Sequence, residues 1–134
     1  MFHLIKILNG RVGVPEPERI ALSSEVNVKY GTLAILKNGT LTPFTAGSTA
    51  LPTHLILADS TGHSVLAAPL SPDMLFEAKL SSSPDAMSVG GEYLLTADGT
   101  AVSATAVSGE KRGALLVDKS GAHAAGDRVC VAFR

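Results

Sequence analysis

One stretch constrains the fold more than any other: residues 30–44, YGTLAILKNGTLTPF. It contains two short runs rich in apolar and β-branched residues, 32–36 and 40–44, separated by Lys37, Asn38 and Gly39. A tight hairpin turn needs positive φ, which Asn and Gly tolerate, so this pattern predicts a β-hairpin. Whatever fold the chain adopts must therefore accommodate an antiparallel ribbon at this place.

Similar turn signals recur along the chain. Asp98-Gly99 separates two apolar runs, residues 93–96 and 101–107, and a cluster at 59–62 separates 54–58 from 63–68. Each pattern predicts a further hairpin. Residues 113–117 and 127–133 also read as strands, and the second of these should turn Val129, Val131 and Phe133 inward.

Residues 74–80, MLFEAKL, allow two interpretations. Ser71-Pro72-Asp73 has the chemistry of a helix start, but the apolar and polar residues after it alternate as in a strand. We predict a strand. Its two faces would then be Leu75, Glu77 and Lys79 on one side, and Met74, Phe76, Ala78 and Leu80 on the other.

Many short strands with turns between them predict an all-β fold, a small antiparallel β-barrel or sandwich built of hairpins. No stretch of ten or more residues has a helical period without Gly or Pro in it. We expect no internal repeat of solenoid length, although the hairpins at Asn38-Gly39 and Asp98-Gly99 have similar chemistry.

The amino-terminal part follows a different pattern. Residues 2–8 read as a strand, and Asn9-Gly10 would turn the chain into residues 11–14 to complete a hairpin. Residues 15–25 begin Pro-Glu-Pro-Glu, which favours an extended arm that is either solvated or laid across another subunit. We therefore divide the chain into residues 1–25, a hairpin and extended arm, and residues 26–134, a barrel or sandwich domain.

The composition excludes several classes of protein. The net charge of the 134 residues is −1, without a basic or acidic run, which disfavours nucleic-acid and anionic-membrane partners. The amino terminus lacks the pattern of a signal peptide, and no apolar run has transmembrane length. The single cysteine, Cys130, fits a protein made in a reducing cytoplasm. Charged residues are only 17%, so we expect part of the surface to be covered by a partner.

No motif predicts catalysis, a metal or a cofactor. The four histidines are scattered without metal-ligand spacing, and no nucleophile elbow or phosphate-binding glycine motif is present. We expect no enzyme and no cofactor. The alternative from another class is a ligand-binding or enzymatic barrel whose mouth would hold His54, His63 and Tyr93.

The chain from residue 28 to 133 resembles the small β-rich head decoration and head-fibre proteins of tailed bacteriophages. The resemblance lies in VKYGTLAILKNGTL, in THLILADSTGHSVLAAPLSPDMLFEAKLS and in the closing AGDRVCVAF. It implies a non-enzymatic protein that binds the outside of the assembled capsid and stabilises it. The implied partners are the major capsid protein and further copies of the chain, with a trimer favoured, and the implied location is the virion after synthesis in the host cytoplasm. A subunit of another large assembly, such as a phage tail or a bacterial shell, is a further alternative.

As a hypothesis, we place the capsid contacts in the amino-terminal segment, residues 2–14, and in the exposed loops. The predicted contact residues are Phe2, Leu4, Ile5, Ile7, Val12, Val14, Pro15 and Pro17.

Overall fold

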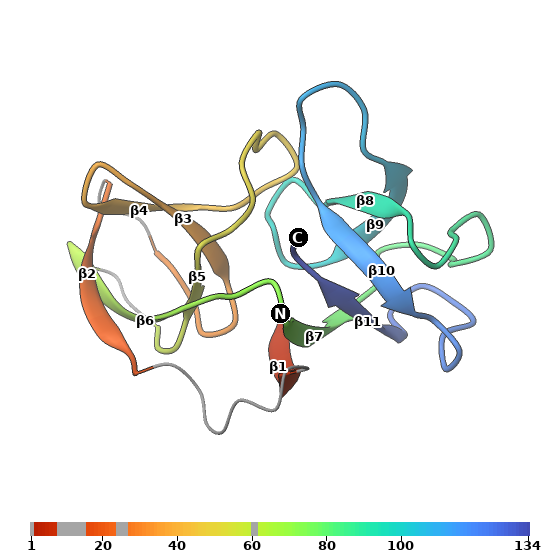
Figure 1. Ribbon diagram of the computed structural model, residues 1–134, viewed down its shortest axis with the longest axis horizontal. Helices are drawn as coiled ribbons and strands as arrows, with labels where there is room; N and C mark the ends of the chain where they lie inside the picture. The colour runs from red at the N-terminus through yellow and green to blue at the C-terminus, as the bar shows by residue number, and fades with distance from the viewer. Residues whose placement is uncertain (1, 8–15, 24–26, 60–61) are drawn as a thin grey trace.

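The fold is built of β-strands alone in the part of the chain that the structure describes. The computed structural model describes residues 2–7, 16–23, 27–59 and 62–134 (Figure 1). These residues contain eleven strands and no helix, which confirms the all-β prediction. They accordingly include no helix capable of spanning a membrane. The strands are β1 (His3–Ile7), β2 (Glu18–Leu22), β3 (Leu33–Lys37), β4 (Thr40–Pro43), β5 (His54–Ile56), β6 (Ser64–Pro69), β7 (Met74–Lys79), β8 (Glu92–Leu95), β9 (Val102–Ala106), β10 (Ala114–Asp118) and β11 (Arg128–Ala132).

The strands form a closed barrel and a larger sheet. The barrel has the order β2-β4-β3-β5-β6, and the six-stranded sheet has the order β1-β7-β11-β10-β8-β9. Figure 1 shows the barrel on the left and the sheet on the right, and the β1 and β7 strands of the sheet lie nearest the barrel. All strand pairs are antiparallel except β2 with β4.

Three of the predicted hairpins, β3–β4, β5–β6 and β8–β9, are confirmed. Asn38 and Gly39, with φ of 52° and 81°, turn β3 into β4, and Gly99, with φ of 72°, lies in the turn between β8 and β9. β5 and β6 also pair as neighbours. Turn chemistry therefore located these connections correctly, because positive φ is a local requirement of the backbone.

The predicted faces of residues 74–80 and of the last strand are also confirmed. Met74, Phe76, Ala78 and Leu80 are all buried, whereas Glu77 is half-buried and Lys79 is exposed. Leu75 is buried as well, although it lies on the same side as Glu77. The inward residues of the last strand, Val129, Val131 and Phe133, are at most 6% exposed.

Residues 18–69 and 74–132 have the same strand pairings, and we call them the first unit and the second unit. In each unit the first strand pairs with the last, the second with the third and the fourth, and the fourth with the last. The registers of the first and last strands correspond residue by residue. The first unit pairs Glu18, Arg19, Ile20 and Ala21 with Ala67, Leu66, Val65 and Ser64, and the second pairs Phe76, Glu77, Ala78 and Lys79 with Val131, Cys130, Val129 and Arg128.

The contact that closes the barrel also occurs in both units. Leu22 pairs in parallel with Leu41 in the first unit, and Leu80 forms a parallel bridge to Val102 in the second. The next backbone N–H, that of Ser23 or Ser81, donates to the carbonyl of Leu41 or Val102 at 3.0 and 2.9 Å respectively.

The chain therefore contains one five-stranded unit twice, in units longer than the solenoid-length repeat that the sequence was expected to lack. The resemblance is hidden because residues at equivalent positions differ in kind. Phe76 of the second unit corresponds to Glu18 of the first, and Ala114 corresponds to His54.

The two units share one hydrophobic core. The core of the second unit also includes Phe2, Leu33, Phe44 and Leu55 from the amino terminus and the first unit. The ring of Phe133 lies edge-on to those of Phe2, Phe44 and Phe76, with centroids 5.8–6.0 Å apart. A smaller core fills the barrel, formed by Leu22, Val28, Ala34, Leu41, Ile56, Val65 and Ala67.

The structure corrects the prediction of an extended arm for residues 18–22. Residues 18–22 form β2, which closes the barrel between β4 and β6, and β1 pairs with β7 of the second unit. Residues 11–14, the predicted hairpin partner of β1, lie outside the described residues. Since β1 belongs to the six-stranded sheet and β2 to the barrel, the boundary that we placed after residue 25 does not separate an arm from a domain.

Candidate interaction surface

The structure places the predicted contact residues of the amino-terminal segment in different environments. Phe2 is fully buried, which corrects its assignment as a contact residue, because a ring packed in the core cannot reach a partner. Leu4 is half-buried against the same core, whereas Ile5 is 52% exposed and Pro17 is exposed. Ile7 lies in β1.

The other three predicted contact residues cannot be placed. Val12, Val14 and Pro15 lie outside the described residues. Of the eight predicted contacts, only Ile5 and Pro17 are therefore shown to be exposed.

Ile5 is exposed because of an irregularity in β1. Leu4 pairs with Phe76 and Lys6 pairs with Leu75, so Ile5 is an extra residue with no partner in β7. A bulge of this kind kinks the strand and redirects a side chain. The apolar side chain of Ile5 consequently lies on the surface although its neighbours in β1 are anchored.

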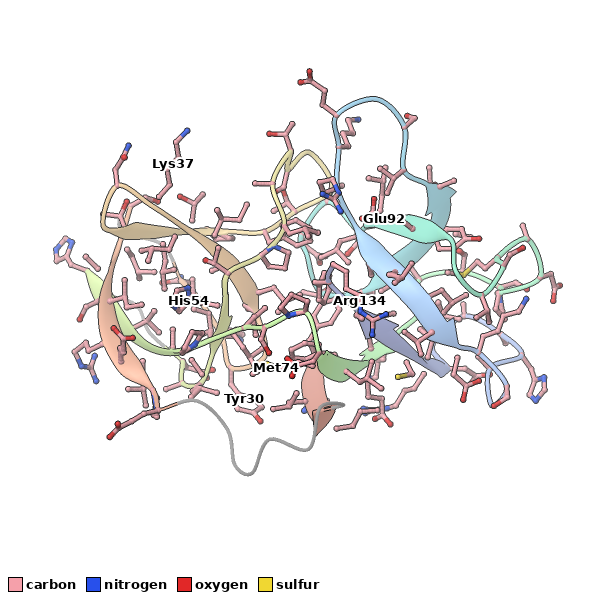
Figure 2. The ribbon with its side chains drawn as sticks, viewed as in Figure 1. Tyr30, Lys37, His54, Met74, Glu92 and Arg134 are labelled. Carbon is pink, nitrogen blue, oxygen red and sulfur yellow. The ribbon has the colours of Figure 1, made fainter. Side chains whose placement is uncertain are left out.

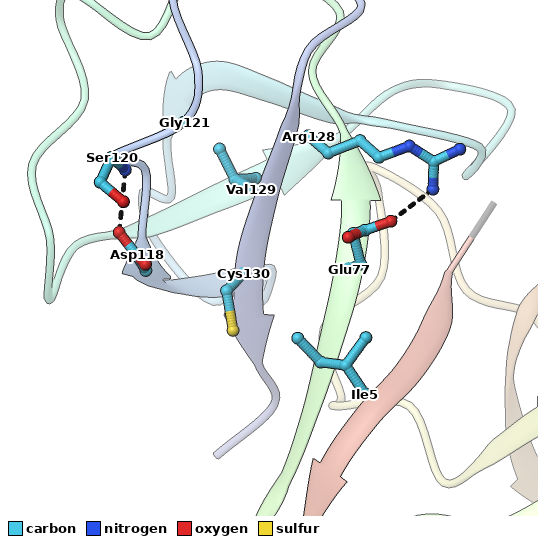
Figure 3. Close-up of a pocket in the computed structure, with 8 residues that line it drawn as sticks. All are labelled: Ile5, Glu77, Asp118, Ser120, Gly121, Arg128, Val129 and Cys130. Atoms are coloured by element: carbon cyan, nitrogen blue, oxygen red, sulfur yellow. Dashed lines mark hydrogen bonds and ion pairs between the residues drawn. The ribbon is translucent and has the colours of Figure 1, made fainter.

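A shallow hollow of about 220 Å³ lies beside Ile5 on the outer face of the six-stranded sheet (Figure 3). In this hollow Arg128 Nη1 donates to Glu77 Oε1 at 2.6 Å, and the backbone N–H of Ser120 donates to the carboxylate of Asp118 at 2.8 Å. The hydrogen bonds from Ser120 lower the pKa of Asp118 and keep it ionised. The ionised groups of the hollow thus already have partners within the chain.

Cys130 lies in the same hollow but is not an activated nucleophile. Burial raises the pKa of its thiol, and the nearby carboxylates of Asp118 and Glu77 raise it further. A reactive cysteine needs the opposite environment, one that stabilises the thiolate. The hollow therefore has no group prepared for covalent chemistry.

Tyr30 extends the apolar surface next to β1. Tyr30 is 42% exposed, and the centroid of its ring lies 6.1 Å from that of His3. Its backbone N–H donates to Asp59 Oδ1 at 2.8 Å, which fixes the turn that carries it. We call His3, Ile5 and Tyr30 the β1 patch. Tyr30 was not among the predicted contacts, because only the tertiary fold brings it to β1.

The residues of the predicted barrel mouth do not form a common site. His54 is 7% exposed within the barrel, with Nδ1 2.9 Å from the hydroxyl of Thr53. Tyr93 is buried in the second unit, where its hydroxyl accepts the N–H of Ser88 at 2.6 Å. His63 is exposed just before β6. Each residue thus has its own local surroundings.

No cluster of three or more His, Cys, Asp or Glu side chains suited to a metal occurs among the described residues. Comparison with known proteins gives no relative: no family model, no curated protein and no solved structure matches the chain.

Proposed function

We propose that the protein decorates the outside of an assembled tailed-phage head and stabilises it through the β1 patch. The observation that carries the proposal is the position of two exposed apolar residues. Ile5 is 52% exposed on β1, just after the buried ring of Phe2, and Tyr30 is 42% exposed on a turn that a hydrogen bond to Asp59 holds in place. Exposed apolar side chains on a rigid element lose little conformational entropy when they bind, so they suit a protein interface.

The chemistry of the surface around the β1 patch supports binding rather than catalysis. Glu77 and Arg128 form an ion pair, the thiol of Cys130 is held protonated, and the net charge of the chain is −1. A neutral surface of this kind fits a protein partner better than a nucleic acid.

Stabilisation would follow from mass action. A protein that binds only the assembled shell lowers the free energy of that state, and the contributions of many copies add. The partners in this proposal are the major capsid protein and further copies of the chain, with a trimer favoured, and the location is the surface of the virion. The protein would be made in the host cytoplasm and would not act as an enzyme.

Deleting residues 1–25 is not a suitable test, because it would remove Phe2 from the core and β2 from the barrel. Single surface substitutions test the β1 patch instead. We expect Ile5→Asp and Tyr30→Asp each to reduce co-sedimentation with assembled phage heads at least tenfold, since each places a charge in an apolar contact.

Val89→Asp is the matched control. Val89 occupies in the second unit the position of Tyr30 in the first, one residue before a glycine with φ near 90°, and it is 59% exposed. It should bind heads like the wild type. Equal binding by all four proteins would reject the β1 patch, and binding to tails but not to heads would favour the alternative assembly.

A further inference from the structure

Because the chain repeats one unit, a buried face of the first unit has an equivalent in the second unit that is only partly buried. In the first unit Leu33 and Leu55 pair across β3 and β5 and are 0% and 5% exposed, because they pack into the core of the second unit. Ile35 and Leu57, two positions further along the chain from each, are half-buried against the same core. The first unit therefore packs against the second unit through this face.

The equivalent residues of the second unit follow from the register. Glu92 pairs with Leu115 as Leu33 pairs with Leu55, so Leu94, two positions further along β8, corresponds to Ile35. Val117 lies two positions beyond Leu115, where the register of β10 shifts after Leu116. The backbone also places Val107 where the first unit has Phe44, because Val107 N donates to Glu92 O as Phe44 N donates to Leu33 O. We call Glu92, Leu94, Val107, Leu115 and Val117 the outer β8–β10 face.

The outer β8–β10 face is apolar but remains partly accessible to solvent. All five of its residues are half-buried, and four of them are Leu or Val. Figure 1 shows β10 at the front of the second unit with no ribbon before it. The outer β8–β10 face is therefore apolar like the equivalent face of the first unit. The second unit covers that face of the first unit, whereas no part of the chain that the structure describes covers the outer β8–β10 face in the same way.

The rim of this face carries one acidic and one basic side chain, so two copies of the face can be complementary in charge. Arg112 Nη2 lies 3.1 Å from Glu92 Oε1 and also donates to the carbonyl of Arg134 at 2.7 Å; Glu92 and Arg134 are labelled in Figure 2. A second copy related by a two-fold axis would bring its own Arg112 to this Glu92, and its Glu92 to this Arg112. Isologous contacts repeat the same surface in this way.

We propose that the outer β8–β10 face binds a second copy of this chain, face to face about a two-fold axis. The side of the second unit that faces the first unit is already occupied in every copy, where the rings of Phe44 and Phe133 pack together. The surface that can cover the outer β8–β10 face is therefore the same face of another copy. This dimer goes beyond the proposed decoration of heads: it forms in solution without a shell, whereas the trimer proposed above is the arrangement on the head surface.

Sedimentation velocity of the purified full chain over a rising concentration series tests the proposal. We expect a reversible monomer–dimer equilibrium whose dissociation constant rises at least tenfold in Leu115→Lys and in Leu94→Lys. Leu36→Lys is the matched control, because Leu36 is a 38% exposed leucine on β3 of the first unit. Circular dichroism melts identify any variant that fails to fold.

A charge exchange tests the geometry. Glu92→Arg alone and Arg112→Glu alone should each be monomeric, because a two-fold pairing then opposes like charges, whereas an equimolar mixture should form heterodimers. A wild type that stays monomeric at every concentration would overturn the proposal. So would undiminished association of both lysine variants, or a mixture that remains monomeric although both proteins are folded.

Discussion

His54 is a residue at which the two units differ in chemical character. It is the one buried polar residue of the described chain, and the equivalent position in the second unit holds Ala114. Burial lowers its pKa below the ordinary 6.5, although Glu18 opposes this shift through its charge. Leu36 N–H donates to Thr53 Oγ1 at 2.7 Å, so the hydroxyl that lies beside His54 is itself held in place.

The lowered pKa predicts a dependence of stability on pH. Because His54 takes up a proton more readily in the unfolded chain, the free energy of unfolding should fall as the pH drops below about 6.5. His54→Ala should remove part of this slope, measured by urea denaturation between pH 7.5 and 5. His123→Ala, at an exposed position, should keep the wild-type slope. Parallel slopes for wild type and His54→Ala would contradict the burial of the neutral imidazole.

At the scale of the elements, the two turn glycines differ in their surroundings. A Cβ added to Gly39 would meet no atom within 4 Å, whereas a Cβ on Gly99 would lie 2.5 Å from the carbonyl oxygen of Phe44. The β8–β9 turn therefore packs against the first unit. Its conformation is also fixed by Asp98, whose pKa falls to about 2 because Thr96 and Thr100 donate hydrogen bonds to it.

This difference predicts unequal costs for the same substitution. Gly39→Ala should cost about 1–2 kcal/mol, since alanine is strained at positive φ but meets no clash. Gly99→Ala should cost a further 1–3 kcal/mol, roughly the range for overpacking, because the Phe44 backbone has to move. The free energies of unfolding in urea provide the comparison. Equal losses would show that the turn does not contact the first unit.

Several strand edges have residues that discourage pairing with other chains. The beginning of β2 has Pro17 and exposed charges, β4 ends at Pro43, and both β1 and β9 contain register shifts. Proline, charge and bulges are the usual means of blocking strand addition. Association of this protein is therefore expected through faces, such as the β1 patch and the outer β8–β10 face, rather than through a shared sheet.

Local chemistry explains what the sequence predicted and what it did not. The hairpins at Asn38-Gly39 and Asp98-Gly99 were predictable because turn residues act on their own neighbours. The pairing of β1 with β7 was not, since it joins residues about 70 positions apart and no local pattern encodes it. Residues 18–22 were read as part of an arm because Pro-Glu-Pro-Glu, which ends at Glu18, breaks the strand pattern where they begin. Of the β1 patch, Ile5 was predicted and Tyr30 was not, because its closeness to His3 is a tertiary contact.

On the scale of the whole molecule, the two units should behave as one cooperative body. The accessible surface is 6752 Å², close to the value of about 6,600 Å² expected for a compact monomer of this mass. Phe133, the ring on which three other rings converge, lies between the units. The chain is therefore compact in spite of its repeat.

We accordingly predict a single thermal transition in differential scanning calorimetry. The calorimetric enthalpy should equal the van't Hoff enthalpy, because the larger core is built from residues of both units and is lost if either unit unfolds. Two resolved transitions, or a calorimetric enthalpy about twice the van't Hoff value, would mean that the units unfold independently.

The central proposal is that the protein binds the outside of an assembled head through the β1 patch. Cryo-electron microscopy of purified, undecorated phage heads mixed with the protein tests this most directly. The account predicts ordered density on the outer surface, with β1 and Tyr30 against the capsid protein and no such density for Ile5→Asp. Bare heads at saturating protein, or density in which the β1 patch faces solvent, would contradict it.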